Sequence, residues 1–66
     1  MRVKVNGEEK ILPEGATLQS LVESMGLTTG RIACEVNMEV VRRADYARTR
    51  LRDGDAVEIV QMIGGG

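Results

Sequence analysis

The chain has 66 residues, a formal net charge of −1, no histidine, one cysteine and one aromatic residue. A domain this short buries only about 60% of the surface that its unfolded chain exposes, which argues against a deep cofactor cleft or a second lobe. Without histidine the usual general base and a common metal ligand are missing, so we expect neither a hydrolytic triad nor an imidazole metal site. The small net charge argues against bulk binding to nucleic acid.

The opening residues predict a β-hairpin. Residues 1–6 alternate between apolar and polar side chains, which is typical of a half-buried strand. Asn6-Gly7 favours a type I′ turn, in which both residues have positive φ, and residues 8–12 form the returning strand. Pro13 ends that strand because it cannot donate to a central ladder.

A helix is expected to begin after Thr17 and to end before Gly26. Thr17 is a good N-cap, but Ser20 stands where a capping box has Glu or Gln, so we expect the reciprocal half of the box to be missing. Gly26 suits the left-handed residue that follows a helix. One stripe of the helix is apolar: Leu18, Leu21, Val22 and Met25.

The second half of the chain predicts three more strands. Residues 32–36 alternate around Cys34, which makes this cysteine a small core residue; the alternative, a reactive thiol, needs a positive and partly exposed setting. A turn at 37–39 leads to a short strand at 40–41. Residues 44–51 are irregular or briefly helical, with Tyr46 as the apolar anchor, and the last strand covers residues 56–63.

These elements predict an α+β fold with one main helix packed on one face of a mixed sheet of four to five strands. The long connection between the first and last strands makes them parallel if they are neighbours. We expect a folded domain at residues 1–63 and a flexible glycine tail at 64–66. The open face of the sheet should carry Lys4, Glu35, Asn37, Glu58, Val60 and Met62.

Val60 and Met62 are apolar on a face that has no partner within the chain. Isolated exposed apolar residues are ordinary on protein surfaces. Because these two stand just before the tail, we interpret them as a docking site, for which methionine is well suited. Five of the nine cations also gather between residues 42 and 52, as a solvated surface or as a docking patch for an acidic partner.

Gly64, Gly65 and Gly66 follow the last strand directly. Three extended glycines reach about 10 Å and can enter a channel that side chains block; the alternatives are a frayed terminus or an expression scar. A terminal carboxylate is an anion with a pKa of about 3.3–3.7, so it transfers nothing until it is activated. The chain has no phosphate-binding loop, so we expect another protein to activate it and expect no enzyme activity here.

Cys34 cannot form an internal disulfide, and small secreted domains normally need such bridges. The first residues lack the apolar core of a signal peptide, and no apolar run approaches the ~20 residues that span a bilayer. We therefore expect a cytoplasmic protein with no membrane partner.

Several short motifs extend over nearly the whole chain: Asn6-Gly7, Pro13-Glu14-Gly15-Ala16-Thr17-Leu18, Glu35-Val36-Asn37, Val41-Arg42-Arg43-Ala44-Asp45-Tyr46-Ala47, Asp53-Gly54-Asp55 and Gly65-Gly66. Together they make the sequence similar to the ThiS family, the ubiquitin-like β-grasp sulfur carriers of thiamin thiazole biosynthesis. The resemblance implies that a ThiF/MoeB-like adenylating enzyme converts the Gly66 carboxylate to an acyl-adenylate with MgATP. A cysteine desulfurase persulfide then supplies sulfur, and thiazole synthase accepts it from a Gly66 thiocarboxylate.

In that scheme Gly64 and Gly65 provide clearance, Val60 and Met62 dock, and the chain itself binds no cofactor or metal. Three alternatives stay open. The first is the small subunit of molybdopterin synthase or a carrier for another sulfur-containing metabolite, although those small subunits usually run longer. The chain could serve as a ubiquitin-like protein modifier, for which the same tail would suffice. A TGS-like RNA-associated module shares some motifs but has no need for a diglycine end.

Overall fold

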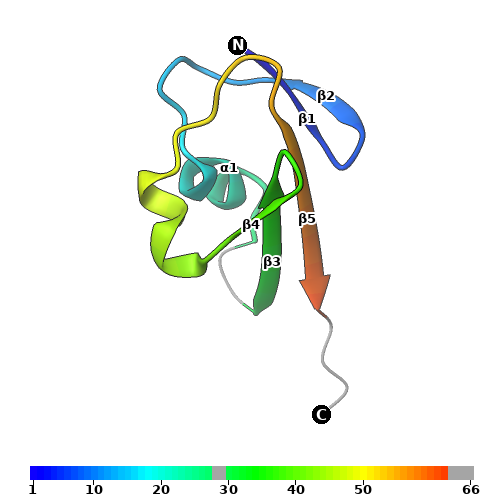
Figure 1. Cartoon of the computed structure of the whole chain (residues 1–66), viewed down its shortest axis with the longest axis vertical. Helices are drawn as coiled ribbons and strands as arrows, with labels where there is room; N and C mark the ends of the chain where they lie inside the picture. The colour runs from blue at the N-terminus through cyan, green and yellow to red at the C-terminus, as the bar shows by residue number, and fades with distance from the viewer. Residues whose placement is uncertain (28–29, 63–66) are drawn as a thin grey trace.

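The computed structural model describes residues 1–27 and 30–62, and a five-stranded sheet dominates it (Figure 1). The elements are β1 (Arg2–Val5), β2 (Glu8–Ile11), α1 (Leu18–Ser24), β3 (Arg31–Val36), β4 (Glu39–Val41), the 3₁₀ helix η1 (Arg43–Arg48) and β5 (Ala56–Met62). In the order β2-β1-β5-β3-β4, the neighbours β1 and β5 pair in parallel, and the other neighbouring strands among the described residues pair antiparallel. The predicted α+β fold, its mixed sheet and the parallel pairing of the first and last strands are confirmed.

Both hairpins turn through residues with positive φ. In the β1–β2 hairpin Asn6 has φ 51° and Gly7 has φ 83°, as the predicted type I′ turn requires. In the β3–β4 hairpin Asn37 has φ 52° and Met38 has φ 70°. Asparagine tolerates this region, whereas a methionine held there costs about 1–3 kcal/mol.

The helix begins with a complete capping box. The Thr17 hydroxyl accepts a hydrogen bond from the Ser20 N–H at 3.1 Å, and the Ser20 hydroxyl accepts one from the Thr17 N–H at 2.9 Å. The prediction that the reciprocal half would be missing is wrong, because a serine oxygen can accept from the cap N–H as a glutamate does. Gly26 follows the helix with φ 74°, as predicted.

The core lies between α1 and one face of the sheet, and η1 closes it at the end where Tyr46 is buried. Its members are Val3, Val5, Leu18, Leu21, Val22, Ile32, Cys34, Tyr46, Leu51, Val57 and Ile59. Each fully buried aliphatic side chain contributes about 1.5–3 kcal/mol. Within the described residues, no helix is long and apolar enough to cross a membrane.

Candidate functional site

The candidate docking site lies on the face of β5 that α1 does not cover. Val57 and Ile59 point into the core, while Val60 is 57% exposed and Met62 is 50% exposed. Successive side chains of a strand point to opposite faces, so the alternation alone separates the two sets. The predicted exposure of Val60 and Met62 is confirmed.

The neighbouring strand β3 extends this surface. Ala33 lies opposite Val60 and Arg31 lies opposite Met62 in the antiparallel ladder. Two residues after Ala33 on the same face of β3, Glu35 lies between Glu58 of β5 and Val40 of β4, an exposed valine. On the open face, Val60 and Met62 therefore have Ala33 and Arg31 as neighbours, and the acidic pair Glu35 and Glu58 lies beside them.

One residue expected on the open face is placed differently. Asn37 lies in the β3–β4 turn, where its side-chain amide donates to the Asp55 carboxylate at 2.9 Å and its amide oxygen accepts from the Ala56 N–H at 3.0 Å. Asn37 therefore holds the start of β5 instead of contributing to a docking surface.

The Asp53-Gly54-Asp55 motif forms the turn before β5. Asp53 accepts the Arg2 N–H at 2.7 Å, and the Gly54 N–H donates to the Arg2 carbonyl oxygen at 2.7 Å. The Asp55 carboxylate accepts the Arg52 N–H at 2.8 Å. These bonds fix the register of β5 against β1, so the Asp53-Gly54-Asp55 motif is structural.

The Asn6 side chain extends the pairing of β5 beyond the end of β1. Its amide oxygen accepts from the Ile59 N–H at 2.7 Å, and its amide nitrogen donates to the Ile59 carbonyl at 3.1 Å. This role was missed in the sequence, where Asn6 indicated only a turn. These two hydrogen bonds hold β5 at Ile59, directly before Val60, so they position the candidate docking site.

Cys34 is fully buried and lies beside Tyr46 in the core. Burial raises the pKa of Tyr46 to about 12, and the neighbouring Cys34 adds to the increase. The partly exposed setting that a reactive thiol needs is not present at Cys34. The prediction that Cys34 is a core residue is confirmed.

Gly64, Gly65 and Gly66, which we expect to carry the chemistry, lie outside the described residues, as does the domain boundary predicted between 63 and 64. The strand that leads towards them is central in the sheet, and its last described residue is Met62. Among the described residues, no group of three or more His, Cys, Asp or Glu side chains could hold a metal ion.

A mixed sheet that curves over one main helix, with its last strand at the centre, defines the ubiquitin-like β-grasp class (Figure 1). The model of the ThiS family matches residues 2–66. The chain therefore belongs to the ThiS family, the sulfur carrier proteins of thiamine biosynthesis.

Three similar proteins illustrate this membership. The sulfur carrier protein ThiS of Thermus thermophilus is 39% identical over 64 residues, covering 97% of this chain and 98% of that protein. The crystal structure of a thiamine biosynthesis protein (ThiS) from Geobacter metallireducens has a TM-score of 0.83 and 30% identity, with both chains covered completely. A thiazole synthase of Paramagnetospirillum magneticum is 38% identical over all 66 residues, but this chain spans only 20% of its length.

Proposed function

We propose that this chain carries sulfur for thiazole formation as a thiocarboxylate on Gly66. Family membership supports the general role of sulfur carrier. The observation that carries the specific proposal is the course of β5, which keeps Val60 and Met62 exposed and leads in the sequence, one residue after Met62, into three glycines. A docking surface beside a slender tail suits a protein whose terminal group is processed in the active sites of other proteins.

The chemistry needs one activation, one sulfur transfer and one reduction, all supplied by partners. A ThiF/MoeB-like adenylating enzyme binds MgATP, and the Gly66 carboxylate attacks the α-phosphorus, forming an acyl-adenylate and releasing pyrophosphate. The terminal sulfur of a cysteine desulfurase persulfide then attacks the acyl carbon and expels AMP. A thiol then attacks the desulfurase sulfur of the resulting acyl disulfide, forms a mixed disulfide with that cysteine and releases the thiocarboxylate on Gly66. A second thiol reduces the mixed disulfide and is itself oxidised to a disulfide.

In this scheme the folded domain is the part that partner proteins recognise and bind. Val60 and Met62 contact the partner through their exposed apolar surface, and Gly64 and Gly65 let the chain pass through a narrow channel. Cys34 takes no part, because it is fully buried in the core. This chain contributes no catalytic side chain and binds no cofactor of its own.

Thiazole synthase is the acceptor that we propose. The Paramagnetospirillum magneticum protein of that name contains a region similar to this whole chain within one polypeptide. Linking two modules raises the effective concentration of one at the other, so their presence in one chain fits a direct transfer between them. We infer the same transfer for this chain and a separate thiazole synthase.

Reconstitution followed by intact-mass spectrometry tests the proposal. The protein is incubated with an adenylating enzyme, MgATP, a cysteine desulfurase, cysteine and a thiol reductant. The expected product has one oxygen replaced by sulfur. A matched variant with one alanine added after Gly66 should stay unchanged, because its reactive carboxylate is displaced. Loading of this variant would contradict the proposal, and an isopeptide bond to a lysine of another protein would indicate a modifier.

A further inference from the structure

The charges of the chain are divided unevenly between two parts. Residues 42–52 hold five arginines and one acid, Asp45, which gives this segment a charge of +4. The rest of the chain holds four cations and nine carboxylates, which gives −5. A nearly neutral protein thus carries one strongly basic segment, and the proposed sulfur transfer has no use for it.

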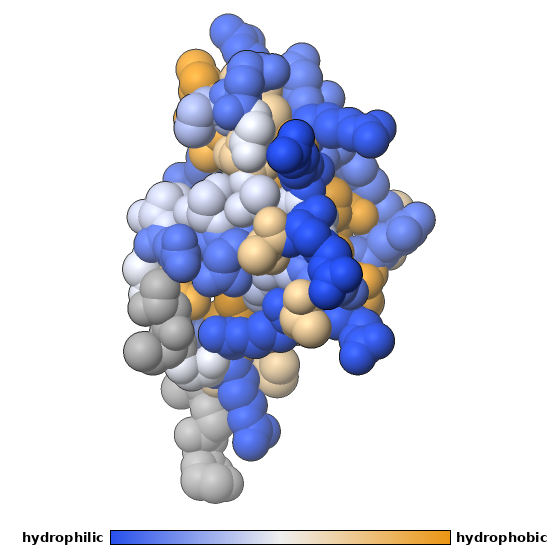
Figure 2. Space-filling model, turned by 90° about the vertical axis from the view of Figure 1, so that its left-hand side faces the viewer, coloured by the Kyte–Doolittle hydropathy of each residue, from blue (hydrophilic) through white to orange (hydrophobic). Residues whose placement is uncertain are grey.

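The five arginines of this segment are all exposed, and we call them the arginine face: Arg42, Arg43, Arg48, Arg50 and Arg52. It extends from the residue before η1, along η1 and into the segment that follows, and Figure 2 shows strongly hydrophilic side chains on this side. Arg48 pairs with Asp45 at 3.2 Å, and Arg43 donates to the Gly30 carbonyl at 3.5 Å. The ion pairs among the described residues include neither Arg50 nor Arg52.

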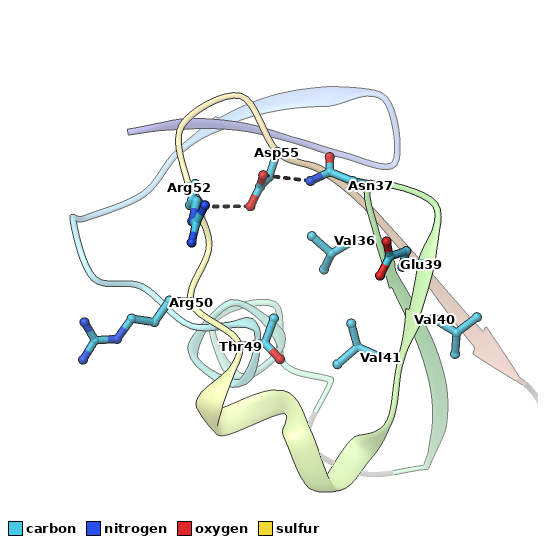
Figure 3. A pocket seen from close by; sticks show the side chains of 9 residues that line it. All are labelled: Val36, Asn37, Glu39, Val40, Val41, Thr49, Arg50, Arg52 and Asp55. Atoms are coloured by element: carbon cyan, nitrogen blue, oxygen red, sulfur yellow. Dashed lines mark hydrogen bonds between the residues drawn. The ribbon is translucent and has the colours of Figure 1, made fainter.

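A groove of about 370 Å³ adjoins the arginine face, between the β3–β4 hairpin and the segment before β5. We call it the hairpin groove; its lining residues are those labelled in Figure 3. The side chains of Val36 and Val41 point into it, and both are only partly buried. Arg52 stands at its rim, and Arg50 projects from the same segment onto the arginine face.

Two carboxylates also line the groove, Asp55 on the same segment as Arg52 and Glu39 across from it. Asp55 already accepts hydrogen bonds from the Asn37 amide and the Arg52 N–H. Glu39 of β4 is exposed on the far side. An incoming group therefore meets the side chains of Val36 and Val41, with Arg52 at the rim beside the already bonded Asp55 carboxylate and Glu39 on the other side.

We propose that the arginine face and the hairpin groove bind an acidic segment of a partner protein. An aliphatic side chain of that segment packs on Val36 and Val41, and flanking carboxylates pair with Arg50 and Arg52. Guanidinium groups bind carboxylates through two parallel hydrogen bonds, which gives this contact both attraction and orientation.

The same observations favour a protein over a nucleic acid. Proteins that hold single strands stack bases on exposed aromatic side chains. The only aromatic residue of this chain, Tyr46, is buried. Glu39 on the far wall would also repel a phosphate backbone, whereas a segment that presents carboxylates on one side only avoids it.

Apart from Val40, whose side chain is on the open face, the proposed surface lies on the helix side of the sheet, away from Val60 and Met62. Tyr46 of η1 belongs to the core that α1 covers, whereas Val60 and Met62 are on the uncovered face. One protein can therefore hold the carrier by the arginine face while another contacts the open face and the tail. This second binding site is independent of the sulfur chemistry proposed above.

Titration by ¹⁵N–¹H NMR tests the inference with a defined probe, a blocked decapeptide that alternates glutamate with leucine. The expected result is saturable shifts at Val41, Thr49 and Arg52 that weaken as salt is raised. The Arg50→Glu/Arg52→Glu variant should bind at least about tenfold more weakly, since two charge pairs become repulsive. The matched Lys4→Glu/Arg31→Glu variant, with the same change in net charge on the open face, should bind as the parent does.

Two further probes complete the test. A peptide with glutamine in place of glutamate should bind at least about tenfold more weakly, because the carboxylates are gone. An oligothymidylate of ten nucleotides should cause no saturable shift in the groove. Equal binding of the glutamine peptide, tighter binding of the oligonucleotide, or shifts confined to Val60 and Met62 would each overturn the proposal. The spectra of both variants report their folding directly.

Discussion

Glu35 of β3 and Glu58 of β5 are direct partners across the antiparallel ladder, on the open face of the sheet. Like charges that lie opposite one another destabilise a sheet by about 0.2–1 kcal/mol. The next residue of β5 on this face is Val60, which belongs to the candidate docking site. A partner that brings a cation to this position would relieve the repulsion, so the pair fits a surface shaped for binding.

Replacing Glu58 by glutamine should therefore have opposite effects on the free protein and on its complex. The free energy of unfolding should rise by about 0.2–1 kcal/mol, because the like-charge pair is gone. Affinity for the adenylating enzyme, measured by calorimetry, should fall. Glu8→Gln is the control, an exposed residue of β2 with the same change in charge. Lower stability together with unchanged affinity would contradict this reading of the pair.

Val60→Asp should weaken binding of the adenylating enzyme by tenfold or more, about 1.4 kcal/mol, while the melting temperature changes little. The exposed position accommodates a charge in the free protein, but the docked complex would bury it. Ile59→Ala is the control on the buried face of the same strand. It should reduce the free energy of unfolding by about 2–5 kcal/mol. Large destabilisation by Val60→Asp with normal binding would place Val60 in the core.

Cys34→Ser should leave sulfur loading largely intact and should reduce stability by about 1–3 kcal/mol, since it buries a hydroxyl among apolar neighbours. Thermal unfolding and the loading reaction measure the two effects separately. Cys34→Ala removes the thiol without adding a polar group and serves as the control. A folded Cys34→Ser protein that no longer loads would show that the thiol takes part.

The raised pKa of Tyr46 predicts that the protein loses stability at high pH. That pKa is raised to about 12 in the folded protein, against about 10 in the unfolded chain. Between these values the unfolded chain loses the proton and the folded protein keeps it, so the free energy of unfolding falls by up to about 1.4 kcal/mol per pH unit.

Denaturant unfolding measured from pH 8 to pH 12 checks this prediction. Below pH 10 Tyr46 should contribute no pH dependence. Tyr46→Phe has no ionisable group at this position, so it should lack this decline. Parallel curves for the two proteins would show that the buried environment does not favour the neutral phenol.

Local patterns predicted much of the fold because they have local causes. Asn6-Gly7 specifies a turn, the stripe from Leu18 to Met25 specifies a helix, and alternation along β5 separates Val57 and Ile59 from Val60 and Met62. The Ser20 hydroxyl in the capping box was missed because the pattern usually has a longer side chain there.

The hairpin groove could not be predicted from the sequence. It forms where Val41 of β4 comes to face Thr49 and Arg52, and this depends on how η1 packs under the sheet. The arginines were visible as a cluster, but no local pattern shows that an apolar floor adjoins them. The pairing of Asn6 with Ile59, 53 residues apart, was hidden for the same reason.

Sulfur carriage on Gly66 can be observed by top-down mass spectrometry of the protein purified from its native host. We expect a population in which the fragments containing Gly66 carry one sulfur in place of one oxygen, and in which the fragment containing Cys34 is unmodified. Sulfur bound at Cys34, or a chain that continues past Gly66 and is never trimmed there, would contradict this expectation.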